Sequence, residues 1–175
     1  GRRRGVLLVN PSGRLAVGVE LGRERVYGVV TDVDGKVLTR ATGTVKRGAQ
    51  SAVLRAAVEQ VIENLLSAAP QGVKVAGIGF VDPGIVDPQS GTSLYSTLFP
   101  RWRDVPISPA LSERFGVPVH LSNTAQAKAV AEHLFGAARQ RSDFIFIEFG
   151  DGLACGIYSG GRLITGADMR AGEFG

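Results

Sequence analysis

The sequence predicts an α/β fold with a mixed sheet, followed by the start of a second sheet. Three strand-like runs come before the first helix, and strands and helices then alternate until a new set of strands begins. Alternating strands and helices build parallel sheets, whereas consecutive strands joined by tight turns build antiparallel ones. We therefore expect one sheet with an antiparallel edge and a separate later hairpin.

The first third of the chain is typical of an antiparallel meander. Apolar residues alternate with others over 15–21, and further strand-like runs cover 26–33 and 36–45. Between the last two runs, Asp34 and Gly35 form a strong signal for a hairpin with a two-residue turn. Three strands are thus expected side by side.

Helix and strand signals alternate through the rest of the chain. A helix is predicted from residue 51 to about residue 69 because apolar residues recur at helical spacing over 53–66, and Ser51 can cap its first turn. Residues 73–80 are typical of a buried strand. The remaining expected elements are helices at 108–115 and 123–135 and strands at 117–121, 144–149, 153–158 and 162–164.

A long loop rich in Pro, Gly, Asp and Ser is expected between residues 81 and 106. Loops of that length inside compact domains are usually functional or mobile. Its carboxylates, Asp82 and Asp87, could serve chemistry or only satisfy nearby backbone amides. Trp102 should anchor the loop in the core or border a cleft.

The composition indicates an ordinary soluble globular protein. The 175 residues are 44% hydrophobic and 21% charged, and no apolar run is long enough to span a bilayer. One cysteine and no export signal favour a reducing cytoplasm. The net charge of +4 is mild, and the one dense basic cluster is 2–4. That cluster is either a solvated tail or the link to an upstream DNA-binding module.

Two glycine turns and one asparagine are the candidates for ligand chemistry. Gly22 lies in a hairpin turn, and Gly150 and Gly152 flank another; such turns can bring backbone amides to a phosphate. Gly22 could equally belong to a plain turn, and the carboxylate of Asp151 would repel a phosphate. Asn123 lies at a strand-to-helix junction, where its side chain could cap the helix or face a ligand.

Five segments resemble the ROK family of sugar kinases and sugar-responsive repressors, in family order and spacing. The segments are residues 77–88 (GIGFVDPGIVDP), 98–106 (LFPRWRDVP), 122–133 (SNTAQAKAVAEH), 149–157 (FGDGLACGI) and 171–175 (AGEFG). The resemblance implies an actin-like ATPase (ribonuclease H-like) fold, with two α/β lobes around a sugar and nucleotide cleft. It divides the chain into a basic linker (1–13), an N-terminal lobe (14–118) and the truncated start of a second lobe (119–175).

The sequence departs from the family's kinases on the phosphate and proton-transfer side. Thr124 stands where they carry the aspartate that acts as general base, and a hydroxyl is too weak a base for that role. Arg23 replaces a glycine of the first phosphate turn, and Asp151 replaces a threonine of the second. The turns at Gly22 and at 150–152 are therefore interpreted as degenerate phosphate loops. We expect no kinase activity, no cofactor and no metal site.

The sugar side is better preserved. Gly84 lies in the loop that closes over the sugar, and Asn123 and Glu173 match the family's sugar-binding positions. The resemblance is to the repressor branch, with its N-acetylglucosamine- and xylose-type repressors. We therefore expect the sugar-sensing domain of a transcriptional regulator, with a sugar or sugar phosphate as effector and DNA bound through an upstream domain.

Several expectations concern the whole protein. The full-length regulator should be a homodimer or larger assembly, and it should have no membrane partner. The 175 residues should be a piece of it, since the family continues into a histidine and a cysteine-rich zinc site. Two alternatives stay open: a divergent ATP-dependent sugar kinase, and a sugar-binding or interaction module with no DNA partner.

Overall fold

A computed structural model describes residues 10, 13–150 and 152–174. The basic cluster at 2–4 and Asp151 lie outside the described residues. Among the described residues, no helix combines the length and the apolar character that crossing a bilayer requires.

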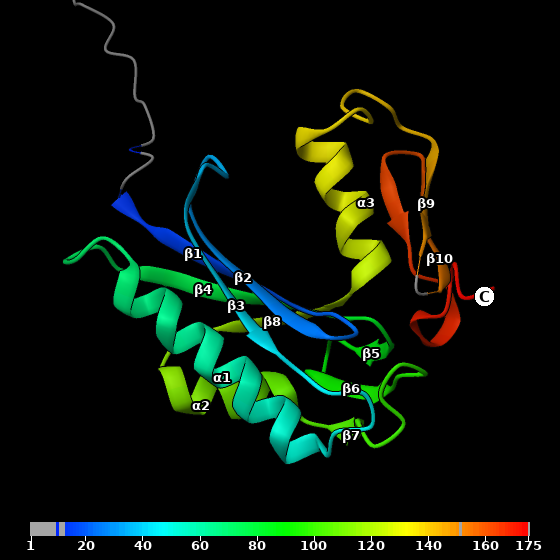
Figure 1. Cartoon of the computed structure of the whole chain (residues 1–175). Coiled ribbons are helices and arrows are strands. Elements are labelled where there is room, and N and C mark those ends of the chain that lie inside the picture. The colour runs from blue at the N-terminus through cyan, green and yellow to red at the C-terminus, as the bar shows by residue number, and fades with distance from the viewer. Residues whose placement is uncertain (1–9, 11–12, 151, 175) are drawn as a thin grey trace, which may run out of the picture.

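The first sheet has five strands in the order β3-β2-β1-β4-β8 (Figure 1). Its strands are β1 (Leu15–Leu21), β2 (Arg25–Asp32), β3 (Val37–Thr44), β4 (Val75–Asp82) and β8 (Val119–Asn123). The β1–β2 and β2–β3 pairs are antiparallel, whereas β1–β4 and β4–β8 are parallel. The predicted mixed sheet with an antiparallel edge is thus confirmed.

The predicted hairpin between β2 and β3 forms, but its loop has four residues, 33–36, instead of two. The reason is a side chain: the Asp32 carboxylate accepts hydrogen bonds from the backbone N–H groups of Asp34 and Lys36. Asx-type bonds of this kind stabilise a wider turn.

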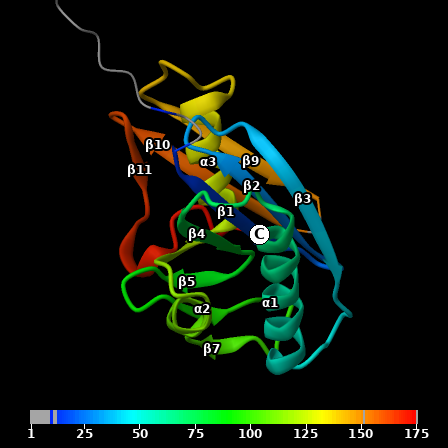
Figure 2. The same cartoon turned by 90° about the vertical axis from the view of Figure 1, so that its left-hand side faces the viewer.

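Two helices cover one face of the first sheet, α1 (Ser51–Ala68) and α2 (Ile107–Phe115) (Figures 1 and 2). The apolar stripe of α1 is fully buried, and it consists of Leu54, Val58, Val61, Ile62 and Leu65. The expected cap was wrong: Gln50 is the N-cap residue and makes no side-chain cap hydrogen bond. The Ser51 hydroxyl instead donates to the carbonyl of Arg101, because the segment before α2 passes beside it.

The expectation of a loop over 81–106 was wrong, because this segment contains a small antiparallel sheet. Its strands, in the order β5-β6-β7, are β5 (Ile85–Asp87), β6 (Thr92–Tyr95) and β7 (Arg103–Val105). Strands of three or four residues are too short for alternation to reveal them. Both views place β5 nearest the C-terminal segment and β7 farthest from it (Figures 1 and 2). Trp102 is fully buried and anchors the segment in the core, as predicted.

The later hairpin belongs to a second sheet, as expected. The helix α3 (Thr124–Phe135) leads to the sheet β11-β10-β9, which is formed by β9 (Phe144–Phe149), β10 (Leu153–Ser159) and β11 (Arg162–Ile164), and then to the short helix η2 (Ala167–Met169). Figure 1 shows α3 and β9–β10 on the side of the first sheet opposite to α1 and α2. The strand β8 belongs to the first sheet, so the sheets change after Asn123. The division into 14–118 and 119–175 stays a prediction.

Candidate functional site

A cavity of about 250 Å³ lies between the two sheets. Its lining consists of Glu20, Leu21, Gly22, Arg23, Pro83, Thr97, Leu98, Asn123, Thr124, Ala125, Glu148, Gly152, Leu153, Ala154 and Glu173. Five of the predicted site residues are among them: Gly22, Asn123, Thr124, Gly152 and Glu173. Gly84 lies just behind the lining, next to Pro83, and Gly150 lies outside it. Segments far apart in the sequence thus meet at one cleft.

Asn123 caps α3, which is one of the two roles that the sequence left open, and it also lines the cavity. It is the last residue of β8 and the N-cap of α3, and its Oδ1 accepts a hydrogen bond from the Gln126 N–H at 3.2 Å. Its Nδ2 donates to the Gly84 carbonyl at 3.0 Å and to Glu173 Oε1 at 3.2 Å. The amide therefore ties the helix start to both predicted neighbours in the site while it is almost fully buried.

Gly84 has no room for a side chain. A Cβ there would lie 2.1 Å from the Tyr95 carbonyl oxygen and 2.9 Å from the Ser96 Cα. The Gly84 N–H donates to Asp82 Oδ1 at 2.8 Å, which holds the Pro83-Gly84 turn against the end of β4. Glycine is thus required here so that the carbonyl can reach Asn123.

Asp82 is a buried carboxylate that stabilises the Pro83-Gly84 turn by its hydrogen bond from the Gly84 N–H. Its second oxygen accepts a hydrogen bond from Trp102 Nε1 at 2.6 Å. Burial raises the pKa of Asp82 above its ordinary value, although hydrogen bonds from Trp102 and Gly84 act in the opposite direction. Sequence reasoning named both residues but not their pairing. Asp82 therefore holds the Pro83-Gly84 turn in place and does not line the cleft.

Glu173 is held in the cleft by the residue before it. Gly172 has φ +91°, and a Cβ there would lie 2.0 Å from the Cys155 carbonyl oxygen, so only glycine fits. The Cys155 N–H donates to the Gly172 carbonyl at 3.2 Å and docks this segment on β10. Partial desolvation raises the pKa of Glu173. Its carboxylate faces the cleft with one oxygen bonded to Asn123.

Thr124 presents a hydroxyl with spare hydrogen-bonding capacity. The residue is 6% exposed and lines the cavity, and its Oγ1 has no hydrogen-bond partner among the described residues. A buried polar group without a partner destabilises a fold by about 1–3 kcal/mol.

The glycine turns have their amides occupied. The Gly22 N–H donates to the Arg25 carbonyl at 2.9 Å, and the Gly150 N–H donates to the Gly152 carbonyl at 3.0 Å. Each bond closes its own turn, so neither N–H points freely to a ligand. For Gly22, this favours the plain-turn alternative.

A paired ammonium at the wall of the cleft is the main site feature that sequence reasoning missed. Lys128 on α3 lies with its Nζ 3.0 Å from Glu20 Oε1 and 2.6 Å from Glu148 Oε1. Desolvation lowers its pKa, but hydrogen bonds to Glu148 and Glu20 outweigh that effect, and the pKa is raised. The three residues come from α3, β1 and β9, so no local pattern could have signalled the cluster.

Comparison with known families settles the lineage. Residues 16–175 match the ROK family. The chain belongs to the ROK family. Within the ROK family, the chain is 34% identical over 176 residues to a putative xylose repressor from Caldicellulosiruptor sp. (strain Rt8B.4), covering all of this chain and 44% of that protein. It therefore spans less than half the length of that relative.

Solved ROK structures share the fold. A ROK family transcriptional regulator, a homolog of the E. coli MLC protein, superposes with a TM-score of 0.85 at 26% identity, covering 95% of this chain and 42% of that one. A ROK family glucokinase from Streptomyces griseus, solved with glucose and AMPPNP, gives a TM-score of 0.80 at 30% identity over 92% of this chain and 49% of that one. The expected actin-like ATPase fold is thus confirmed, and regulators and kinases both share it.

Proposed function

We propose that this chain is the sugar-sensing domain of a ROK-family transcriptional regulator and binds a sugar without phosphorylating it. The observation that carries the proposal is the cluster in which Asn123 fixes Glu173 and the Gly84 carbonyl beside the Thr124 hydroxyl. Carboxylate, amide and hydroxyl groups are the partners that sugar hydroxyls need. The similarity to a putative xylose repressor supports the regulatory role.

The same cleft supports the proposed absence of catalysis. Phosphoryl transfer to a sugar hydroxyl needs a base within hydrogen-bond reach and donors for the phosphates. Thr124 supplies no base near neutral pH, and the N–H groups of Gly22 and Gly150 are used inside their own turns. A cleft that keeps hydroxyl-binding groups and lacks these parts is suited to sensing.

The partners of the full-length protein are part of the proposal. DNA is bound through a domain upstream of this one, in a homodimer or larger assembly, and the sugar changes the affinity for DNA. A gel-shift assay with the full-length gene product and its own promoter region, with and without the sugars that bind, tests this step. Sugar binding without any DNA complex would favour the module with no DNA partner.

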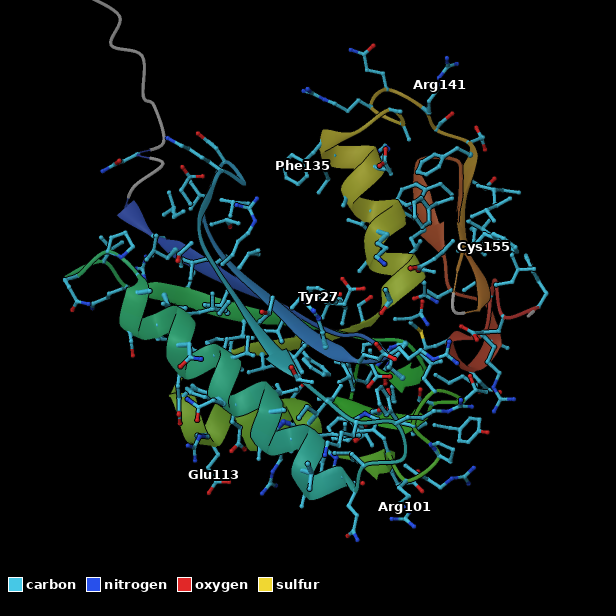
Figure 3. All side chains as sticks on the ribbon, viewed as in Figure 1. Tyr27, Arg101, Glu113, Phe135, Arg141 and Cys155 are labelled. Atoms are coloured by element: carbon cyan, nitrogen blue, oxygen red, sulfur yellow. The ribbon has the colours of Figure 1, made fainter. Side chains whose placement is uncertain are left out.

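Isothermal titration calorimetry of the protein with pentoses, hexoses and N-acetylhexosamines tests the sugar site. Glu173→Gln keeps the size of the side chain but removes its charge, and we expect at least about tenfold weaker binding because charged hydrogen bonds contribute about 1.5–3 kcal/mol. Glu113→Gln is the matched control, because Glu113 lies on the outer side of α2, far from α3 (Figure 3). Unchanged binding in Glu173→Gln would contradict the assigned site.

The alternative is a divergent ATP-dependent sugar kinase, which the similarity to the Streptomyces griseus glucokinase favours. Incubation of the protein with MgATP and the same sugars decides between the two. We expect no turnover in the wild type and none in Thr124→Asp, since the phosphate turns also differ. Turnover that Thr124→Ala abolishes would establish the kinase instead.

A further inference from the structure

Lys128 ties together three elements around the cleft. Its ammonium group bonds to Glu20 at the end of β1 and to Glu148 on β9, at 3.0 and 2.6 Å. Both carboxylates line the cavity. Each is about one-third exposed, as is Lys128, so the cluster lies at the wall of the cleft and not in the core. The positive charge of Lys128 is therefore already paired with two negative ones.

The charges around the cleft are unfavourable for an anion. The lining carries the carboxylates of Glu20, Glu148 and Glu173 and the guanidinium of Arg23. With Lys128 added, three negative charges face two positive ones among the residues that the structure describes. A phosphate ester brings a further charge of about −1.5 to −2. It would meet a net negative wall, whereas an uncharged sugar would meet carboxylate acceptors for its hydroxyl groups.

We propose that Lys128 is the resident counter-ion of the cleft, so that the site takes a free, uncharged sugar and discriminates against sugar phosphates and nucleotides. This inference rests on the proposed sugar-sensing function and narrows it. The ammonium is paired with the carboxylates of Glu20 and Glu148, which offset its attraction for a phosphoryl group. The backbone N–H groups of Gly22 and Gly150 are used inside their own turns and do not replace it.

A second hollow beside the cleft offers a phosphate group another place to bind. It has a volume of about 560 Å³, lies on the other side of the β1–β2 turn and shares Glu20, Gly22 and Arg23 with the cleft. Arg25, Tyr27 and Arg47 contribute to its lining, and Figure 3 shows Tyr27 on the side of the first sheet that faces α3. A phosphate that reached these arginines would escape the repulsion inside the cleft.

Calorimetry at low ionic strength tests the inference with matched pairs. The probes are D-glucose, D-mannose, N-acetyl-D-glucosamine and D-xylose, each beside its terminal phosphate ester. For the sugar that binds, we expect its ester to bind at least about tenfold more weakly. The double variant Glu20→Gln/Glu148→Gln removes both carboxylate partners of Lys128. The gap, meaning the ratio of the affinity for the sugar to that for its ester, should then shrink at least about threefold. Glu113→Gln should leave the gap unchanged.

Each outcome decides one question. An ester that binds as tightly as its sugar would overturn the inference and leave the proposed function standing, and Arg47→Gln would then show whether the second hollow holds the phosphate. An unchanged gap in a double variant that still binds the sugar would also overturn it. If the double variant does not fold, Glu148→Gln alone provides the same test with a smaller change. Binding of no member of any pair would overturn the proposed function, and this inference with it.

Discussion

Asn123 Nδ2 and Glu173 Oε1 are joined by a hydrogen bond of 3.2 Å across 50 residues of sequence. The bond connects the last residue of the first sheet to the segment that follows the second sheet. Because Asn123 also caps α3 and holds the Gly84 carbonyl, four parts of the chain share one amide group. The proposed site is therefore a structural junction as well as a pocket.

Two substitutions of Asn123 should separate the contribution of its helix cap to stability from the contribution of its other hydrogen bonds. Asn123→Ala removes all of them, and we expect a loss of about 2–4 kcal/mol in the free energy of unfolding, because a cap contributes about 1 kcal/mol and buried partners are left unpaired. Asn123→Ser keeps a cap oxygen for the Gln126 N–H and should recover about 1 kcal/mol. Urea denaturation measures both. Equal losses would mean that the cap contributes nothing.

Gly84→Ala should be strongly destabilising, whereas Gly150→Ala should not. The new Cβ at position 84 would overlap the Tyr95 carbonyl, and overpacking of this kind destabilises by about 1–3 kcal/mol or more. At Gly150, no atom of the described residues lies within 4 Å of the built Cβ, so we expect a change below about 1 kcal/mol. Thermal unfolding of the two variants checks this. Similar shifts in both would contradict the tight approach at Gly84.

Trp102→Phe should destabilise the fold by about 2–4 kcal/mol, because it leaves the buried Asp82 carboxylate without one donor and opens a small cavity. A double-mutant cycle with Asp82→Asn isolates the pair, and we expect a coupling free energy of about 1.5–3 kcal/mol. Additive effects within about 0.5 kcal/mol would show that the Trp102–Asp82 bond does not stabilise the native state.

The buried Asp82 predicts a distinctive pH dependence. Burial raises its folded-state pKa above the ordinary value of about 3.8, so the folded state keeps a proton that the unfolded state has lost. Stability from this group is therefore present at low pH and falls as the pH rises from about 3.8 to the folded pKa. Relative to Asp82→Asn, the wild type should lose up to about 1.4 kcal/mol per pH unit in that window. A relative gain with rising pH would show that the hydrogen bonds outweigh burial.

The sequence was informative where periodicity extends over many residues or where one residue type has a strong local preference. The alternation over 15–21, the apolar stripe of α1 and the cap at Asn123 were all predictable because each depends on neighbours within a few residues. The family resemblance placed Glu173, which no local pattern indicates. These features account for the main sheet, its helices and the part of the site that Asn123 and Glu173 form.

The remaining features depend on contacts between distant residues. The strands β5 to β7 are too short for their pattern to differ from that of a loop. The Trp102–Asp82 bond spans 20 residues, and Lys128 meets Glu20 and Glu148 only because the two sheets close around α3. A charged residue on a helix is ordinarily solvated, so Lys128 gave no signal in the sequence.

The buried indole of Trp102 also provides the molecule with its own optical reporter. It is the only tryptophan in the chain, so the tryptophan part of the intrinsic emission has a single source. From this ring, hydrogen bonds run to Asp82, through the Gly84 backbone to Asn123, and on to Glu173. A sugar that shifts this series of hydrogen bonds should change the wavelength or the yield of the Trp102 emission. Effector binding could then be followed in solution without a label, and the same signal would record how fast the cleft responds.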